Sequence, residues 1–402
     1  MTDVASTTCA VDLAARHLGA GVVAASDESF GDKEHLLVEA EPHFVPGRYD
    51  HRGEVVDGWE TRRRRDGGEL DWAVIRLAPA GRIHRIGVDT RHFTGNHPAR
   101  CLVEASGVEG YPSPDELARA DWSVVVGWTA LTGDAHHLFD VGDARRFTHL
   151  RLAIAPDGGV ARLRVRGEVV VDPRAMDGLT VDVASQRFGG RVTASSDDFY
   201  TSAQVLNRPD RARTMGEGWE TRRRRDDGHD WVVIRLAARS HLRQVEVDTS
   251  HFVYNASATC AVWLSDEDDP DPREDVAWWP LLGPTRLQPD TLHVFGVDPS
   301  RAARHARLDV YPDGGLARLR LRGAVAGAAR RDLGLRWLGS LPTPQLVDVL
   351  VGGAGLTPSA AQQLADERLL GAGEQGLQDG HVDTFLELAR GNPRLAALIN
   401  GG

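Results

Sequence analysis

Hydrophobic and polar residues alternate along most of this chain in short runs with a period of two. The runs DWAVIRLA (residues 71–78) and DWVVIRLA (230–237) are rich in β-branched residues, which favour strands. In RLAIAPDGGVARLRVRG (151–167) a Pro-Asp-Gly-Gly turn joins two such runs, because glycine supplies the positive φ that tight hairpins need. Many short strands with turn signals between them predict antiparallel β-sandwich or jelly-roll domains.

The returning strand of this hairpin has one polar and one apolar face. Arg162, Arg164 and Arg166 alternate with Leu163 and Val165, so the arginines share one face of the strand and the aliphatic residues share the other. The same alternation recurs later in the chain, at Arg318, Leu319, Arg320, Leu321 and Arg322.

This recurrence is part of an internal duplication that covers most of the chain. The clearest pairs are GWETRRRR (58–65 and 218–225), VAASDESF with VTASSDDF (23–30 and 192–199), and VDTRHFTGN with VDTSHFVYN (88–96 and 247–255). A repeat unit of about 150 residues is too long for a solenoid. We therefore expect two homologous all-β modules.

The pattern changes near residue 332. The segments TPQLVDVLVGG, TPSAAQQLADE and HVDTFLELARG predict short helices, two of which open with threonine and proline and one of which ends at glycine. The predicted organisation is an N-terminal tail (1–18), two tandem jelly-roll-like β-sandwich modules (19–172 and 173–332) and a small helical appendage (333–402).

Composition narrows the class of protein. The 402 residues are 41% hydrophobic and 26% charged, as in globular proteins, and the net charge is −11. A negative chain argues against nucleic acid or an anionic membrane surface as a partner. The three cysteines, Cys9, Cys101 and Cys260, form no disulfide framework or zinc motif, and no signal peptide or membrane span is evident. We expect a cytoplasmic protein.

Several duplicated motifs together resemble the allantoicase (allantoate amidinohydrolase) family. They are DGWETRRRR followed by a DW strand, VDT with HF and N, and the YPDGG-ARLR-RG hairpin, and they span residues 19–323. The resemblance implies two related jelly-roll-like modules, hydrolysis of allantoate to ureidoglycolate and urea in purine degradation, and an assembly of identical subunits. It implies no organic cofactor and assigns no catalytic residues.

The chemistry of allantoate indicates which residues are needed. One tetrahedral carbon carries a carboxylate and two ureido groups, so urea can leave by proton transfer, and water can then add to the resulting imine. A guanidinium group meets a carboxylate with two parallel hydrogen bonds. The predicted substrate-binding residues are therefore Arg62, Arg64, Arg222 and Arg224. If residues 59–65 are extended, Glu60, Arg62 and Arg64 share one face; alternatively, these arginines only form ion pairs between modules or subunits.

The acid and base candidates are again duplicated residues: Glu60, Glu220, Asp89, Asp248, His92 and His251. Histidine titrates near neutral pH, but His92 and His251 can equally fix their loops by hydrogen bonding. Asn96 and Asn255 can read a ureido group, or serve only as turn residues. His229 has no counterpart in the first module, and this asymmetry favours the second module if only one is catalytic.

Two other interpretations receive less support from the sequence. The segment DAHHLFD (134–140) resembles the Asp-Ala-His of manganese ureohydrolases, but no partner motif accompanies it. No motif indicates a metal site, although scattered carboxylates and histidines can hold a divalent ion. Tandem jelly rolls can also be carbohydrate- or ligand-binding modules without catalysis, because fold alone does not establish an activity.

Overall fold

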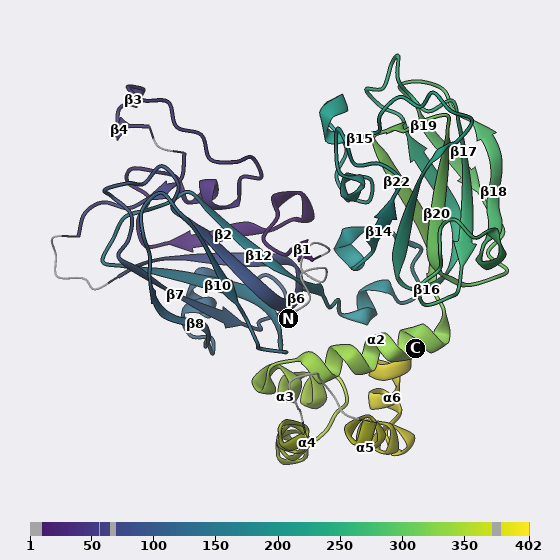
Figure 1. Cartoon of the computed structure of the whole chain (residues 1–402). Helices are drawn as coiled ribbons and strands as arrows, with labels where there is room; N and C mark the ends of the chain where they lie inside the picture. Colours follow the sequence, from purple (N-terminus) through teal and green to yellow (C-terminus); the bar gives the residue numbers. More distant parts are fainter. Residues whose placement is uncertain (1–9, 56, 65–69, 372–378, 402) are drawn as a thin grey trace. The chain divides into compact units, whose positions relative to one another are not determined.

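A computed structural model of the chain describes residues 10–55, 57–64, 70–371 and 379–401. Its contacts divide the chain into two compact units, each containing one module (Figure 1). One unit holds Ala10–Val170 with Arg336–Leu395, and the other holds Val171–Leu335 with Ala396–Gly402.

The first module is built almost entirely of strands. They are β1 (Val11–Asp12), β2 (Gly21–Ala25), β3 (Tyr49–Asp50), β4 (Gly53–Glu54), β5 (Trp59–Glu60), β6 (Asp71–Asp89), β7 (Arg100–Ser106), β8 (Ser123–Ala130), β9 (His136–Asp140), β10 (Arg146–Ala155), β11 (Gly159–Val160) and β12 (Arg162–Val169). Its described residues also form a short α-helix, α1 (Pro114–Ala118), and short 3-10 helices at Arg16–Leu18 and Lys33–Leu37. All pairings are antiparallel, in the order β1-β12-β6-β10-β7-β8, and β2 and β9 also pair with β6.

The second module repeats this topology. Its strands are β13 (Val181–Asp182), β14 (Arg191–Ser195), β15 (Trp219–Glu220), β16 (Asp230–Asp248), β17 (Thr259–Ser265), β18 (Trp279–Arg286), β19 (Leu292–Gly296), β20 (Ala303–Tyr311), β21 (Gly315–Leu316) and β22 (Arg318–Val325). The sheet order is β13-β22-β16-β20-β17-β18, with β14 and β19 also on β16. The predicted all-β fold in two homologous modules is confirmed.

The long strand of each module connects two groups of strands. Residues 71–76 of β6 pair with β10, Gly81 and Arg82 pair with both β10 and β12, and the strand then continues beside β12 to Asp89. The ladder with β10 shifts between Phe147 and His149. In β16 the corresponding shift lies between Arg235 and Ser240. The second half of each long strand thus gains β12 or β22 as a neighbour.

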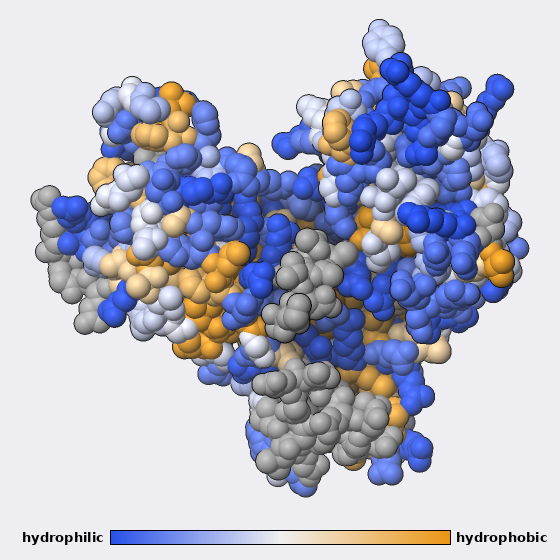
Figure 2. All heavy atoms as spheres, in the orientation of Figure 1, coloured by the Kyte–Doolittle hydropathy of each residue, from blue (hydrophilic) through white to orange (hydrophobic). Residues whose placement is uncertain are grey.

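The hairpin strands have the two faces that the sequence predicts. In β12, Leu163 and Val165 are buried in the core, whereas Arg166 is exposed. In β22, Leu319 and Leu321 belong to the hydrophobic core of the second module. The arginines between them therefore point away from the core. Over the molecular face drawn in Figure 2, hydrophilic residues predominate on both modules, with a few apolar patches.

The segments near both ends of the chain differ from the predicted organisation. Val11 in β1 pairs with Gly167 in β12, so the first sheet starts inside the segment predicted as a tail, whose residues 1–9 lie outside the described part. The appendage, which was predicted as three helices, has five in its described residues: α2 (Gly327–Ser340), α3 (Thr343–Gly352), α4 (Pro358–Gly371), α5 (Asp379–Gly391) and α6 (Pro393–Asn400). Within the described residues, no helix is both long and apolar enough to span a membrane.

The arginine run is extended for a shorter distance than predicted. Only Trp59 and Glu60 form β5, and Arg62 and Arg63 are both exposed. The backbone amide of Arg62 donates to the carboxylate of Asp27 (2.8 Å) rather than to a neighbouring strand. A side-chain carboxylate thus accepts the hydrogen bond that a backbone carbonyl of a neighbouring strand would accept. The alternation of buried and exposed faces ends after Thr61, which is buried. Arg65 lies outside the described residues.

Candidate active site

The second half of β16 forms a polar surface with its two neighbouring strands. Asp248 pairs with Arg318 of β22 and with Leu292 of β19. Two residues earlier, Glu246 pairs with Arg320. Directly paired residues project from the same face of a sheet, so the arginines of β22 lie beside the carboxylates of β16, on the face away from the core.

A loop covers one side of this surface, and arginines of β22 hold it. Arg318, which is fully buried, donates from Nε to the carbonyl oxygen of Asp210 (3.1 Å) and from Nη2 to its carboxylate (2.9 Å). Arg320 donates to the carbonyl oxygens of Arg208 (2.8 Å) and Pro209 (3.0 Å). These guanidinium groups fix loop 208–212, because three of the four bonds satisfy backbone carbonyls that no strand pairs.

His251 fixes the end of the same loop. Its φ is 71°, and its backbone amide donates to the carboxylate of Asp290 (2.8 Å). Its Nε2 lies 3.0 Å from the carbonyl oxygen of Ala212, and since a carbonyl only accepts, the ring donates. His92 makes the same contacts in the first module, to Asp134 (2.9 Å) and to the carbonyl of Pro42 (3.1 Å).

These contacts match the loop-fixing interpretation of the two histidines, and their acid/base role stays a prediction.

Strands and loop together enclose a cavity of about 230 Å³. Its lining residues are Pro209, Arg211, Glu246, Asp248, Leu292, Arg318, Arg320 and Arg322. Four guanidinium groups and two carboxylates line it, and two of the arginines also pair with carboxylates behind the pocket, Arg318 with Asp210 (2.9 Å) and Arg320 with Asp182 (3.4 Å). The exposed guanidinium group of Arg211 and the donors of Arg322 that face the cavity can bind a small organic anion.

The charged groups in the pocket differ in how many hydrogen bonds they already make within the protein. Arg322 pairs through Nε with Glu246, which also accepts from the amide of Gln244 (2.8 Å). The carboxylate of Asp248 accepts from the backbone amide (2.9 Å) and the hydroxyl (2.5 Å) of Ser250. Among the contacts of the described residues, none engages the two terminal nitrogens of Arg322. Arg322 therefore keeps donors for a ligand.

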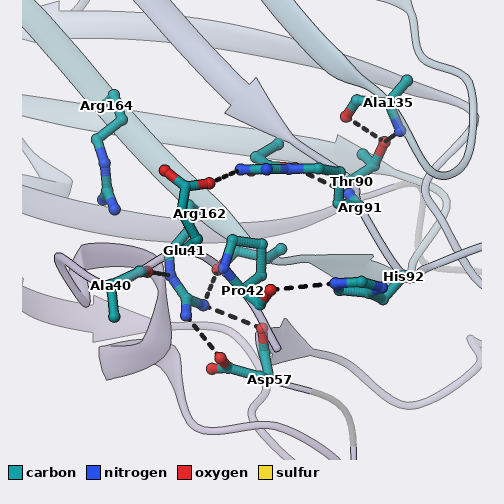
Figure 3. A network of polar contacts seen from close by, with 12 residues as sticks. Ala40, Glu41, Pro42, Asp57, Thr90, Arg91, His92, Ala135, Arg162 and Arg164 are labelled. Atoms are coloured by element: carbon teal, nitrogen blue, oxygen red, sulfur yellow. Dashed lines mark hydrogen bonds and ion pairs between the residues drawn. The ribbon is translucent and has the colours of Figure 1, made fainter. Parts of the chain in front are cut away.

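The first module carries a related network (Figure 3). Asp89 pairs with Arg162 across β6 and β12, and Arg162 donates from Nε to the carbonyl of Ala40 (2.9 Å). Burial acts to raise the pKa of Asp89, but hydrogen bonds and charge from Arg91 outweigh it and hold the pKa below its usual range. Asp89 is thus an anion with a fixed partner.

Each module has a further polar cluster, with Glu60 beside β11 in the first and Glu220 beside β21 in the second. Asn96 donates to Glu60 (2.7 Å) and Asn255 donates to Glu220 (2.6 Å), so each module brings together two candidates that the sequence did not predict to be in contact. Burial raises the pKa of Glu60, and the hydrogen bond from Asn96 only partly offsets it. A carboxyl group with a raised pKa is a reasonable acid or base.

The predicted carboxylate-binding arginines do not line the cavity of the second module. Arg62 and Arg222 have side chains 69% and 65% exposed. They pair with Asp27 (3.4 Å) and Asp197 (2.8 Å), respectively. Their role in substrate binding stays a prediction.

Arg64 and Arg224 lie deeper but already have acidic partners. They pair with the buried carboxylates of Asp71 (2.6 Å) and Asp230 (2.7 Å). A buried carboxylate left without its cation is costly, so these two arginines support the fold.

The arginines of β22 are not among the site residues predicted from the sequence, although their alternating pattern is visible there. Arg318, Arg320 and Arg322 were assigned to one strand face, and the signal that would have selected them is three arginines on that face. Glu246 and Arg211 gave no signal, because their place in the pocket depends on strand register and loop position. Among the described residues, no group of three or more histidines, cysteines or carboxylates is arranged to hold a metal ion.

Comparison with known proteins relates the sequence and the fold of this chain to one family. A family model described as an allantoicase repeat matches residues 11–170 and 181–326. A probable allantoicase from Streptomyces avermitilis is 46% identical over 333 residues, covering 79% of this chain and 87% of the relative. One from Nocardia farcinica is 46% identical over 318 residues, covering 79% and 94%. The crystal structure of allantoicase from Saccharomyces cerevisiae matches with a TM-score of 0.66 and 32% identity, covering 80% of this chain and 94% of the other.

Proposed function

Because the chain belongs to the allantoicase family, we propose that it hydrolyses allantoate to ureidoglycolate and urea, in the pocket of the second module. The observation that carries the location is the cavity where Arg322 and Arg211 lie beside Asp248 and Glu246. The guanidinium groups of Arg211 and Arg322 suit a substrate with one carboxylate. The alternative, a ligand-binding module without catalysis, explains the cavity but not the family.

Some residues of the pocket bind the substrate, and another transfers the proton. The free nitrogens of Arg322, with the exposed Arg211, bind the carboxylate of allantoate as a fork. Asp248 then takes the N–H proton of the retained ureido group and delivers it to the nitrogen of the departing one. The bond from carbon to that nitrogen breaks, urea leaves, and an imine remains. Water adds its oxygen to the imine carbon and a proton to the nitrogen, which gives ureidoglycolate.

The scheme needs no thiol nucleophile, and the described cysteines fit this. Cys101 and Cys260 are free and buried. Burial raises the pKa of the Cys101 thiol to about 11 and that of Cys260 to about 12, so both are protonated at neutral pH. Unpaired cysteines support a reducing, cytoplasmic location, and the family resemblance supports an assembly of identical subunits.

The test is urea release from allantoate by the purified protein. Asp248→Asn keeps the shape of the side chain but removes its proton-accepting charge, so kcat is expected to fall by about 10² to 10⁴, with the melting temperature preserved. Binding of allantoate without urea release would establish the ligand-binding alternative. An unchanged kcat in the variant would place the chemistry elsewhere.

A further inference from the structure

The two modules build this surface with the same contacts, which allows a position-by-position comparison. In the first module Arg162 binds the carbonyl of Ala40, and in the second Arg318 binds that of Asp210. Likewise His92 binds the carbonyl of Pro42, and His251 binds that of Ala212. Ala40 therefore corresponds to Asp210, and Pro42 corresponds to Ala212.

The residue between these two loop anchors differs in charge. It is Glu41 in the first module and Arg211 in the second. A second difference lies on the strand side, two residues after Asp89 and Asp248: the first module has Arg91 there, and the second has Ser250. The two differences are coupled, because Arg91 pairs with Glu41.

Arg91 bridges the strand end and the loop of the first module. Its Nε lies 3.0 and 2.8 Å from the two carboxylate oxygens of Asp89, and its Nη2 bonds to Glu41 (Figure 3). The carboxylate that corresponds to Asp248 is thus already occupied by a cation. In the second module the short Ser250 leaves space, and Arg211 lines the cavity instead of closing it.

A further exchange separates the two surfaces. Opposite Arg164 the first module has Gly87, whereas opposite Arg320 the second has Glu246. A side chain at Gly87 would begin 3.1 Å from the ring nitrogen of His136, and Leu292 replaces that histidine in the second module. The first module therefore has no counterpart of Glu246, the carboxylate that orients Arg322 in the second.

We infer that each chain has one catalytic pocket, in the second module, and that the Arg91–Glu41 bridge closes the equivalent surface of the first. The inference rests on the proposed function. Two pairs of positions decide between the closed and open states: 41 with 91, and 211 with 250. The β scaffold of the first module accommodates the closed arrangement, because Arg91 pairs with both Asp89 and Glu41.

The test transfers the bridge from one module to the other. In R211E/S250R the new arginine pairs with Asp248 and the new glutamate, so urea release is expected to fall by about 100-fold or more. The melting temperature is expected to stay within about 3 °C, because the first module already folds with this arrangement. The matched control, E41R/R91S, opens the first module and keeps urea release within about two-fold.

A binding measurement supports the test independently of turnover. Calorimetric titration of Asp248→Asn with allantoate is expected to show one site per chain, and two sites would overturn the inference. Full activity of R211E/S250R would also overturn it, as would equal losses in the two double variants. If Asp248→Asn itself keeps full activity, the proposed site is wrong, whereas an inactive Asp248→Asn with an active R211E/S250R refutes only the closure.

Discussion

Arg322 offers the most direct test of how the pocket recognises its substrate. The side chain is 37% exposed and pairs through one nitrogen with Glu246, so its two terminal nitrogens are placed to meet a carboxylate. A hydrogen bond between charged groups contributes about 1.5–3 kcal/mol. Because water reaches this side chain, we take the lower part of that range, about 1.5–2 kcal/mol, which corresponds to about 10- to 30-fold in KM.

The variant Arg322→Ala is therefore expected to raise KM for allantoate by about 10- to 30-fold with a smaller change in kcat. Steady-state urea release over a range of allantoate concentrations measures both constants. Arg322→Lys keeps the positive charge but loses the planar fork, so it is expected to fall between wild type and Arg322→Ala.

Two controls separate substrate binding from general effects of charge. Arg166 occupies the same position of β12 as Arg322 does of β22, since each lies four residues after the arginine that pairs with Asp89 or Asp248. Arg222 belongs to the duplicated arginine run and is 65% exposed. Arg166→Ala and Arg222→Ala are both expected to leave KM near the wild-type value. An unchanged KM in Arg322→Ala, with a raised KM in Arg222→Ala, would refute our assignment and restore the arginine run as the binding site.

Two further predictions concern stability and pH. The pKa of Glu60 is raised above its ordinary 4.5 by burial, so its stabilising contribution is present at low pH and is lost as the pH rises through the folded pKa. Glu60→Gln keeps the Asn96 contact and is expected to raise the free energy of unfolding at pH 7, with the difference vanishing below pH 4.5; a less stable variant at pH 7 would contradict this. The buried His149 has a pKa lowered from 6.5 to about 4, mainly by burial. Between these two pH values the histidine is protonated in the unfolded chain but not in the folded protein, so the free energy of unfolding decreases by up to about 3 kcal/mol as the pH falls. Denaturant titrations of His149→Gln between pH 7 and 4 are expected to show a flatter pH dependence than wild type, and parallel curves would rule this out.

Much of the fold was predictable because its signals are local. Alternation along a strand follows from the pleat of the backbone, so the arginine and leucine faces of β12 and β22 could be identified from their own residues. The duplication needs no structure, since it is a comparison of the chain with itself. The Glu60–Asn96 pair was anticipated only in part: both residues were candidates, but the contact between them was not.

The sequence by itself therefore determined the strand faces, the two homologous modules and the residue types that anion chemistry needs. Tertiary structure alone decided which arginines meet a cavity. Arg62 and Arg222 form ion pairs with Asp27 and Asp197, whereas Arg322 reaches the pocket because β22 pairs in register with β16. Register and loop position join residues far apart in the chain, and their energies depend on packing that no short stretch contains.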